Sequence, residues 1–406
     1  MTNEPVATQI NPTVYSDYSL QFNRWSLKPI GAWPSTLSTS KPERIISVAL
    51  MVICFSSILF SVVPCWLHVF LEDESFYVKM KVLGPLFHWM LGAIIYITLL
   101  LRHNNIRHCV NHIETDWKMV TRKKDEQIML RNAKFGRYIA ICCVIFVQAG
   151  IMAYCLITAS NTQIVEIGNE TRILHTLPMA TYEKLIPVNR NHVNEIVIFS
   201  QFLSGFIVNT TEAGLYSLAA VMAAHACGQL DVLMVWIDDF VKEARNGGKD
   251  ALFREIAIIV EHHLRVLDFI SHIEEMMNQV CFLELFRCTL AVCMLGYYIF
   301  MEWADSDVRN LTTYFTIFVG IVFNTFMLCY IGELLTEKCM KVGEVVYMTD
   351  WYYLPQKRIL DLILIIARSS VVVEITAGKL IHMSVYTFGD VMKSSFAYMN
   401  MLCQMS

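Results

Sequence analysis

The stretch ILDLILIIARSSVVVEITA, residues 359–377, decides how many times this chain can cross a membrane. It is apolar enough to be considered as a span, but it carries Asp361, Arg368 and Glu374. Each charge costs roughly 2.5–3.5 kcal/mol at the centre of a bilayer on scales derived from helix insertion. We therefore interpret the stretch as a helix packed against protein outside the bilayer.

Seven other runs can cross a membrane as helices, which takes about 20 apolar residues each. Composition supports this interpretation, because 55% of the 406 residues are hydrophobic and only 17% are Asp, Glu, Lys or Arg. The sequence thus predicts an all-α membrane protein with seven transmembrane helices. The predicted spans are 45–70, 82–101, 138–160, 196–226, 280–303, 312–335 and 384–405.

Lysine and arginine predict the orientation, because they concentrate in cytoplasmic connections. They are frequent before the first span and in 102–137 and 242–265, whereas the last connection on the other side contains only Arg309. We expect a cytoplasmic N-terminus and an extracellular C-terminus, with a glycosylation acceptor at Asn169 outside. A G-protein-coupled receptor, the alternative with seven spans, has the opposite orientation. It usually needs a disulfide to the second outer loop, and here 161–194 contains no cysteine.

The polar connections also contain helical patterns. Residues 226–245 continue the fourth span with apolar residues at helical spacing, and 251–279 shows a second apolar stripe. Such helices need a packing partner outside lipid, so we predict a cytoplasmic helical anchor that includes 359–377. The expected organisation is an N-terminal cytoplasmic segment (1–44), spans one to four (45–225), a first anchor segment (226–279), spans five and six (280–335), an anchor helix (336–383) and a last span (384–406).

Few residues indicate a catalytic, cofactor-binding or metal-binding function. We find no catalytic, nucleotide-binding or zinc-binding motif, so we predict neither an enzyme nor a cofactor or metal. A net charge of −4 argues against nucleic-acid binding, which needs concentrated Lys and Arg. Three histidines follow the second span among basic residues, and we expect them to face lipid headgroups: His103, His108 and His112.

Charged residues inside the predicted spans need partners. Glu284 and Arg287 are three residues apart on the fifth span, and Asp390 and Lys393 are three apart on the last. Both pairs have the spacing of a helical ion pair. Glu212 in the fourth span has no such neighbour, so it requires an interhelical partner or a water-filled cavity.

The outer halves of spans two to six carry aromatic and soft side chains at helical spacing. Each stripe alone could equally face lipid or pack against another helix. Together they could line a mostly apolar pocket with a few polar groups, the usual form of a small-molecule site. The candidate ligand-binding residues are His88, Trp89, Gln148, Ile151, Met152, Cys155, Phe202, Phe206, Thr210, Tyr297, Phe300, Tyr314 and Phe318.

Four stretches resemble the insect odorant receptor family, and a hymenopteran tuning subunit in particular. The chain lacks the long insertion between spans four and five of the family's co-receptor, so it resembles the odorant-binding subunit. It departs from the family's Ser-Tyr-Ser-Tyr at 395–398, where SFAY lacks two of the hydroxyls. The stretches are YSLQFNRWSLKPIGAWP (18–34), HACGQLDVLMVWIDDFV (225–241), DWYYLPQKRILDLILIIARSS (350–370) and ITAGKLIHMSVYTFGDVMKSSFAYMNML (375–402).

The resemblance implies a ligand-gated, non-selective cation channel of four subunits, usually including the co-receptor. It would lie in the plasma membrane of an olfactory sensory neuron dendrite, in contact with lipid. A small hydrophobic odorant or pheromone would bind in the outer half of the helices. The last span would line the pore, with Met401 and Met405 on one face as an apolar gate and Gln404 near permeating cations. Packing of these methionines between helices, and a gustatory receptor channel, remain the alternatives.

Overall fold

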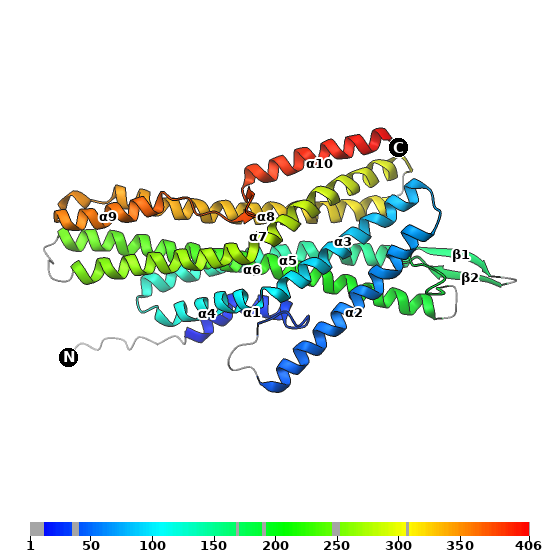
Figure 1. Ribbon diagram of the computed structural model, residues 1–406, viewed down its shortest axis with the longest axis horizontal. Helices are drawn as coiled ribbons and strands as arrows, with labels where there is room; N and C mark the ends of the chain where they lie inside the picture. The colour runs from blue at the N-terminus through cyan, green and yellow to red at the C-terminus, as the bar shows by residue number, and fades with distance from the viewer. Residues whose placement is uncertain are drawn as a thin grey trace.

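The computed structural model describes residues 12–34, 40–167, 170–188, 192–245, 252–305 and 308–405, and these ranges are largely helical (Figure 1). Within them, six helices are long and apolar enough to cross a membrane. The more polar α10 (Val385–Met405) is the seventh helix that the sequence predicts. The six are α2 (Lys41–Leu71), α3 (Phe76–Leu101), α5 (Lys123–Ser160), α6 (Val193–Arg245), α7 (Leu252–Asp305) and α8 (Val308–Met348).

Helices α6 and α7 are far longer than a bilayer is thick. α6 has 53 residues and α7 has 54, so each extends about 80 Å at 1.5 Å per residue, against about 30 Å of hydrocarbon. Their extensions form a helical bundle with the end of α8, with α4 (His103–Met119) and with α9 (Gln356–Ser369) (Figure 1). The segments in which the apolar stripes predict helices are thus helical and pack together, and their position outside the lipid stays a prediction.

α6 is the central helix of the molecule. It packs against α1 (Pro12–Leu27), α2, α3, α5, α7 and α8, and its side chains from Ile207 to Leu233 are buried without interruption. A helix that is buried on all sides can be apolar or small on every face. Small residues allow the closest approach, because a Cβ on Gly136 of α5 would lie only 2.6 Å from Cβ of Ala224.

The stretch 359–377 does not form a span. Most of its apolar part belongs to α9, an amphipathic helix of 14 residues that buries Leu362 and Ile365 and packs on α8. The chain then turns through two short strands, β3 (Thr376–Ala377) and β4 (Ile381–His382). Gly378 adopts a positive φ of 63° in this turn and donates its N–H to the carbonyl of Asn278 on α7. The hairpin thereby fixes the point from which α10 starts.

Two ordered elements were not expected. The N-terminal segment contains α1, whose Leu27 packs so closely on α6 that a Cβ on Gly214 would lie 2.4 Å from Leu27 Cδ2. Just after this helix, Ile30 accepts a hydrogen bond from the Tyr96 hydroxyl (2.7 Å). At one end of the molecule, β1 (Thr162–Ile167) and β2 (Glu170–His175) form an antiparallel hairpin (Figure 1). Asn169, the predicted glycosylation acceptor, lies outside the described residues.

Candidate ligand-binding site

A cavity of about 140 Å³ lies among five helices, α3, α5, α6, α7 and α8. An engineered apolar cavity of about 150 Å³ in another protein takes up benzene, so this space admits a molecule of about that size. Apolar and aromatic side chains form most of its wall: Pro85, Phe87, Leu91, Phe146, Val147, Ile151, Tyr154, Leu290, Met294, Leu295, Tyr298, Tyr314, Ile317 and Ile321. The polar lining residues are Lys81, His88, Asn209, Glu212, Arg287 and Asn324.

Helix α3 forms the part of the cavity wall for which the sequence prediction was most accurate. Pro85 lies inside the helix, where it removes a backbone hydrogen bond. The absence of a side chain at Gly84 allows Tyr298 of α7 to approach, since a Cβ there would lie 3.0 Å from the Tyr298 hydroxyl. Trp89 is buried, and its Nε1–H donates to Ser204 Oγ of α6 at 3.0 Å. These contacts hold the side of α3 that faces the cavity against its two neighbours.

A buried charge cluster forms one end of the cavity. Arg287 donates through Nη2 to Glu284 Oε2 at 2.8 Å and to the Tyr216 hydroxyl at 2.8 Å, as the helical spacing of Glu284 and Arg287 predicts. Its Nη1 lies 3.4 Å from Glu212 Oε2 of α6. His88 Nδ1 lies 3.7 Å from the other oxygen of Glu212. Glu212 therefore has interhelical partners, but two carboxyl groups share one guanidinium.

The opposite end of the cavity is aromatic. Tyr298 packs against Tyr314 with ring centroids 5.5 Å apart, and its hydroxyl donates to the Met80 carbonyl. Arg287 and Tyr298 lie on one helix, about 16 Å apart along its axis at 1.5 Å per residue. The site is thus elongated, with the cluster of Glu212 and Arg287 at one end and aromatic rings at the other, where Lys81 pairs with Glu302 at 2.6 Å.

Four of the thirteen predicted residues line this cavity: His88, Trp89, Ile151 and Tyr314. Gln148 and Thr210 instead bond to each other, with Nε2 donating to Oγ1 at 3.1 Å. A separate shallow depression between α5 and α6 is lined by another four of them, with Ile151 shared: Met152, Cys155, Phe202 and Phe206. Half of the Phe206 side-chain surface is exposed, so these residues face away from the cavity.

The remaining three predicted residues lie around Tyr298. Tyr297 is buried in an apolar cluster with Met294, Leu295 and Tyr298, and Phe318 packs against that cluster. Phe300 is 61% exposed. Sequence reasoning missed Tyr298, although Arg287, Ala291, Met294 and Tyr298 recur at helical spacing. Following one helix face from the charged residue would have found it.

One side of the last helix, α10, is exposed. α10 packs on α7 and α8 (Figure 1), where Gly296 permits a close approach, since a Cβ there would lie 2.4 Å from Met399 Sδ. Met401 is 56% exposed and Gln404 is also exposed. Asp390 and Lys393 form the predicted pair at 3.2 Å. Leu402 and Cys403 pack against the cluster that contains Tyr298, so the end of α10 touches the wall of the cavity.

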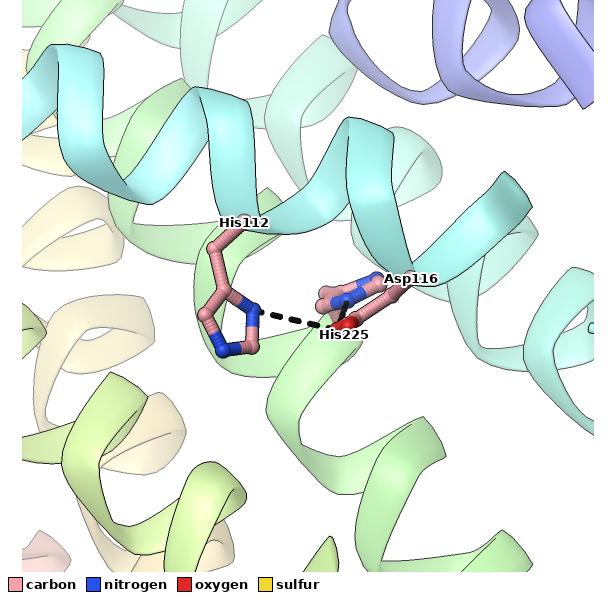
Figure 2. A group of neighbouring side chains, drawn as sticks. All are labelled: His112, Asp116 and His225. Carbon is pink, nitrogen blue, oxygen red and sulfur yellow. Dashed lines mark hydrogen bonds and ion pairs between the residues drawn. The ribbon is translucent and has the colours of Figure 1, made fainter. Parts of the chain in front are cut away.

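A second charged cluster lies in the bundle outside the lipid, where α4, α6 and α7 meet (Figure 2). Asp116 Oδ2 lies 2.8 Å from His225 Nε2 and 3.1 Å from His112 Nδ1, and Asp116 also pairs with Arg265. The expectation that His112 faces headgroups was wrong, because its side chain is 10% exposed and stacks on Phe269. Burial alone would raise the pKa of Asp116, but hydrogen bonds from both histidines outweigh it and hold the pKa well below its usual range.

These three side chains offer ligand atoms within 4.8 Å of one another, as a metal site would. The guanidinium of Arg265 nevertheless provides the positive charge here. Its Nε donates to His112 Nε2 at 3.4 Å, which leaves the proton of that ring on Nδ1, toward Asp116. The cluster is thus an ion-pair network that ties three helices together.

The architecture is that of a seven-helix membrane protein with a small-molecule cavity among its helices. Residues 75–396, more than half of the chain, match the family described as 7tm Odorant receptor. The chain therefore belongs to the seven-transmembrane odorant receptor family. This membership favours the odorant receptor interpretation over the G-protein-coupled receptor and gustatory alternatives.

Similar proteins agree with this assignment. Odorant receptor 67c of Drosophila melanogaster is 21% identical over 186 residues, which is 46% of this chain and 44% of the relative. Odorant receptor 10 of Aedes albopictus is 20% identical over 148 residues, 36% of this chain and 39% of the relative. The matched parts thus span less than half the length of these curated relatives.

Solved structures show the same fold over nearly the whole chain. The insect olfactory receptor OR5 from Machilis hrabei superposes with a TM-score of 0.78 at 12% identity, covering 96% of this chain and 100% of that one. OR5 in complex with eugenol gives the same TM-score and identity and covers 98% of this chain and 100% of that one.

Proposed function

We propose that this chain is the ligand-binding subunit of an odorant-gated, non-selective cation channel. It would assemble with the odorant receptor co-receptor as a hetero-tetramer in the plasma membrane of olfactory neuron dendrites. The observation that carries the proposal is the mostly apolar cavity among five helices, with Glu212 and Arg287 at one end. The complex of the structurally similar OR5 with eugenol supports a small odorant as the ligand.

The exposed surfaces support assembly around a pore. Met401 and Gln404 are exposed on one side of α10, and four such helices could surround an aqueous path. A ring of apolar side chains such as Met401 would then block ions by dewetting. The outer face of α9 exposes Leu360, Ile363 and Leu364, and we propose that neighbouring subunits cover it. Met405 would belong to the same gate.

The contacts around Tyr298 suggest how a ligand opens the channel. Tyr298 and Met294 line the cavity, and Leu402 and Cys403 of α10 pack on the same cluster. A ligand that binds the open arrangement more tightly shifts the equilibrium by its differential affinity alone. Tyr297 and Phe318, which do not line the cavity, would act in this cluster by transmitting the shift rather than by contacting the odorant.

Current recordings in cells that express the chain with and without the co-receptor test the proposal. We expect at least one small odorant of a broad panel to evoke a cation current only with both subunits present. Deleting residues 401–406 should abolish gating or assembly, whereas unchanged currents would refute the gate. A panel without any response, despite surface expression and a working co-receptor, would refute the function.

Orientation requires its own test, because the proposal places the N-terminus in the cytoplasm and the C-terminus outside. In intact cells, an epitope tag at the C-terminus should be accessible to antibody, whereas a tag at the N-terminus should not. Asn169→Gln should remove a glycan-dependent mobility shift. An accessible N-terminal tag would contradict the arrangement.

A further inference from the structure

The charged end of the cavity contains hydrogen-bond acceptors that nothing occupies. Glu212 and Asn324 both line the cavity and are 1% and 2% exposed. Glu212 Oε1 and Asn324 Oδ1 are buried and accept no hydrogen bond. A buried acceptor without a donor is costly, so native proteins seldom leave two of them at one site unless a partner arrives.

The donors in the cavity wall are already engaged. Trp89 Nε1–H donates to Ser204, and the hydroxyls of Tyr154 and Tyr298 donate to the carbonyls of Pro178 and Met80. The amide nitrogen of Asn324 donates to the Gly320 carbonyl. Arg287 directs its donors to Tyr216, Glu284 and Glu212. A ligand at this end thus meets two acceptors without a hydrogen bond from a described residue, whereas each donor group named here already has a partner.

Charge favours the same kind of ligand. Glu212 and Glu284 lie beside one guanidinium, so the cluster has one more acid than base unless His88 is protonated. A ligand N–H or O–H pointing at Glu212 Oε1 supplies a donor to this carboxyl oxygen. A ligand carbonyl or ether oxygen at the same place would face acceptors and be repelled.

We infer that the preferred ligand has a compact apolar body that carries a hydroxyl or amino group, and that this group donates to Glu212 Oε1 or Asn324 Oδ1. The inference rests on the proposed function and narrows its ligand class. The cavity of about 140 Å³ limits the apolar body to roughly one ring. The ring lies toward Tyr298 and Tyr314, and the donor points toward Glu212.

Four compounds with one skeleton test this inference in cells expressing the chain and the co-receptor: benzyl alcohol, benzylamine, benzyl methyl ether and toluene. We expect the half-maximal concentration of the alcohol or the amine to be about tenfold lower than that of the ether and toluene, which corresponds to about 1.4 kcal/mol. Equal potency of the ether or of toluene with both donor compounds would overturn the inference while leaving the proposed function intact. If an odorant of the broad panel activates the receptor but none of the four does, the inference is likewise overturned.

Two substitutions test which residue accepts the hydrogen bond from the ligand. Asn324→Leu keeps the branching of the side chain and removes Oδ1, and Glu212→Gln keeps the shape and removes the charge. At least one of the two variants should reduce the potency ratio between donor compound and toluene by at least about threefold, and a ratio does not depend on expression level. Glu337→Gln is the matched control, because Glu337 is an exposed acid on the same helix as Asn324. An unchanged ratio in both variants overturns the assignment to these two acceptors. The wild-type comparison decides the ligand class in either case.

Discussion

Replacing Arg287 by leucine should strongly destabilise the folded receptor, and the size of the effect follows from its surroundings. Arg287, Glu284 and Glu212 are all buried, and the guanidinium lies 2.8 Å and 3.4 Å from the two carboxyl groups. Removing one partner of a buried ion pair costs about 3–5 kcal/mol, because the other charge stays buried without compensation. Here two carboxyl groups lose their cation together. We therefore expect a loss at the upper end of this range, a large fraction of the 5–15 kcal/mol that stabilises a typical folded protein.

Cell-surface labelling and the melting temperature of the receptor in detergent measure this loss. The triple variant Arg287→Leu, Glu212→Gln, Glu284→Gln removes the uncompensated charge and should recover most of the surface expression. Arg131→Leu is the matched control, because Arg131 also pairs with a carboxylate, at 3.3 Å from Asp231, but is itself exposed. Exposed pairs contribute little, so its melting temperature should hardly change. Normal expression of Arg287→Leu, or failure of the neutral triple variant to improve on it, would refute the reasoning.

Three further outcomes are expected. Gly296→Val places a side chain where α10 packs on α7. The current without ligand should therefore change, while the ranking of ligands by potency stays the same. A reordered ranking with a normal resting current would contradict the role of this contact. Tyr298→Ala enlarges the cavity and should shift preference toward larger odorants, whereas Phe206→Ala should not, because that side chain faces away; recordings over a homologous series separate the two. The depressed pKa of Asp116 contributes stability above the ordinary pKa of about 4, and this is lost as pH falls below it. Melting temperature between pH 7 and pH 3 should fall less steeply for Asp116→Asn, and parallel curves would contradict the assignment.

Local features of this chain were predictable where one segment contained all the relevant information. Glu284 and Arg287 pair because three residues on a helix bring their side chains together. The rejection of 359–377 as a span depended only on its own charges, and α9 is indeed a short amphipathic helix. The partner of Glu212 could not be predicted in this way. It depends on how α6 and α7 are rotated about their axes, which no single segment specifies.

The ligand-binding residues show the same division. His88 and Trp89 lie on the predicted face of α3, but Phe202 and Phe206 lie on a face of α6 that points away from the cavity. On α7, the cavity is lined by Tyr298 and not by its neighbour Tyr297. Successive residues of a helix point in directions that differ by 100°. A set of pocket residues chosen by composition is therefore wrong when the rotation of the helix about its axis is not known.

The amino-acid sequence alone determined that the chain is helical, that the six segments which form long apolar helices are apolar enough for lipid, and that 359–377 does not form a spanning helix. These properties follow from the free energy of placing each segment's own side chains and backbone in hydrocarbon. Only the tertiary structure decided which helix faces surround the cavity, which partners neutralise Glu212, and where the last helix meets the cavity wall. The reason is that lipid tails and a protein interior are similarly apolar. Hydrophobicity therefore cannot distinguish a side chain that faces lipid from one that faces a ligand.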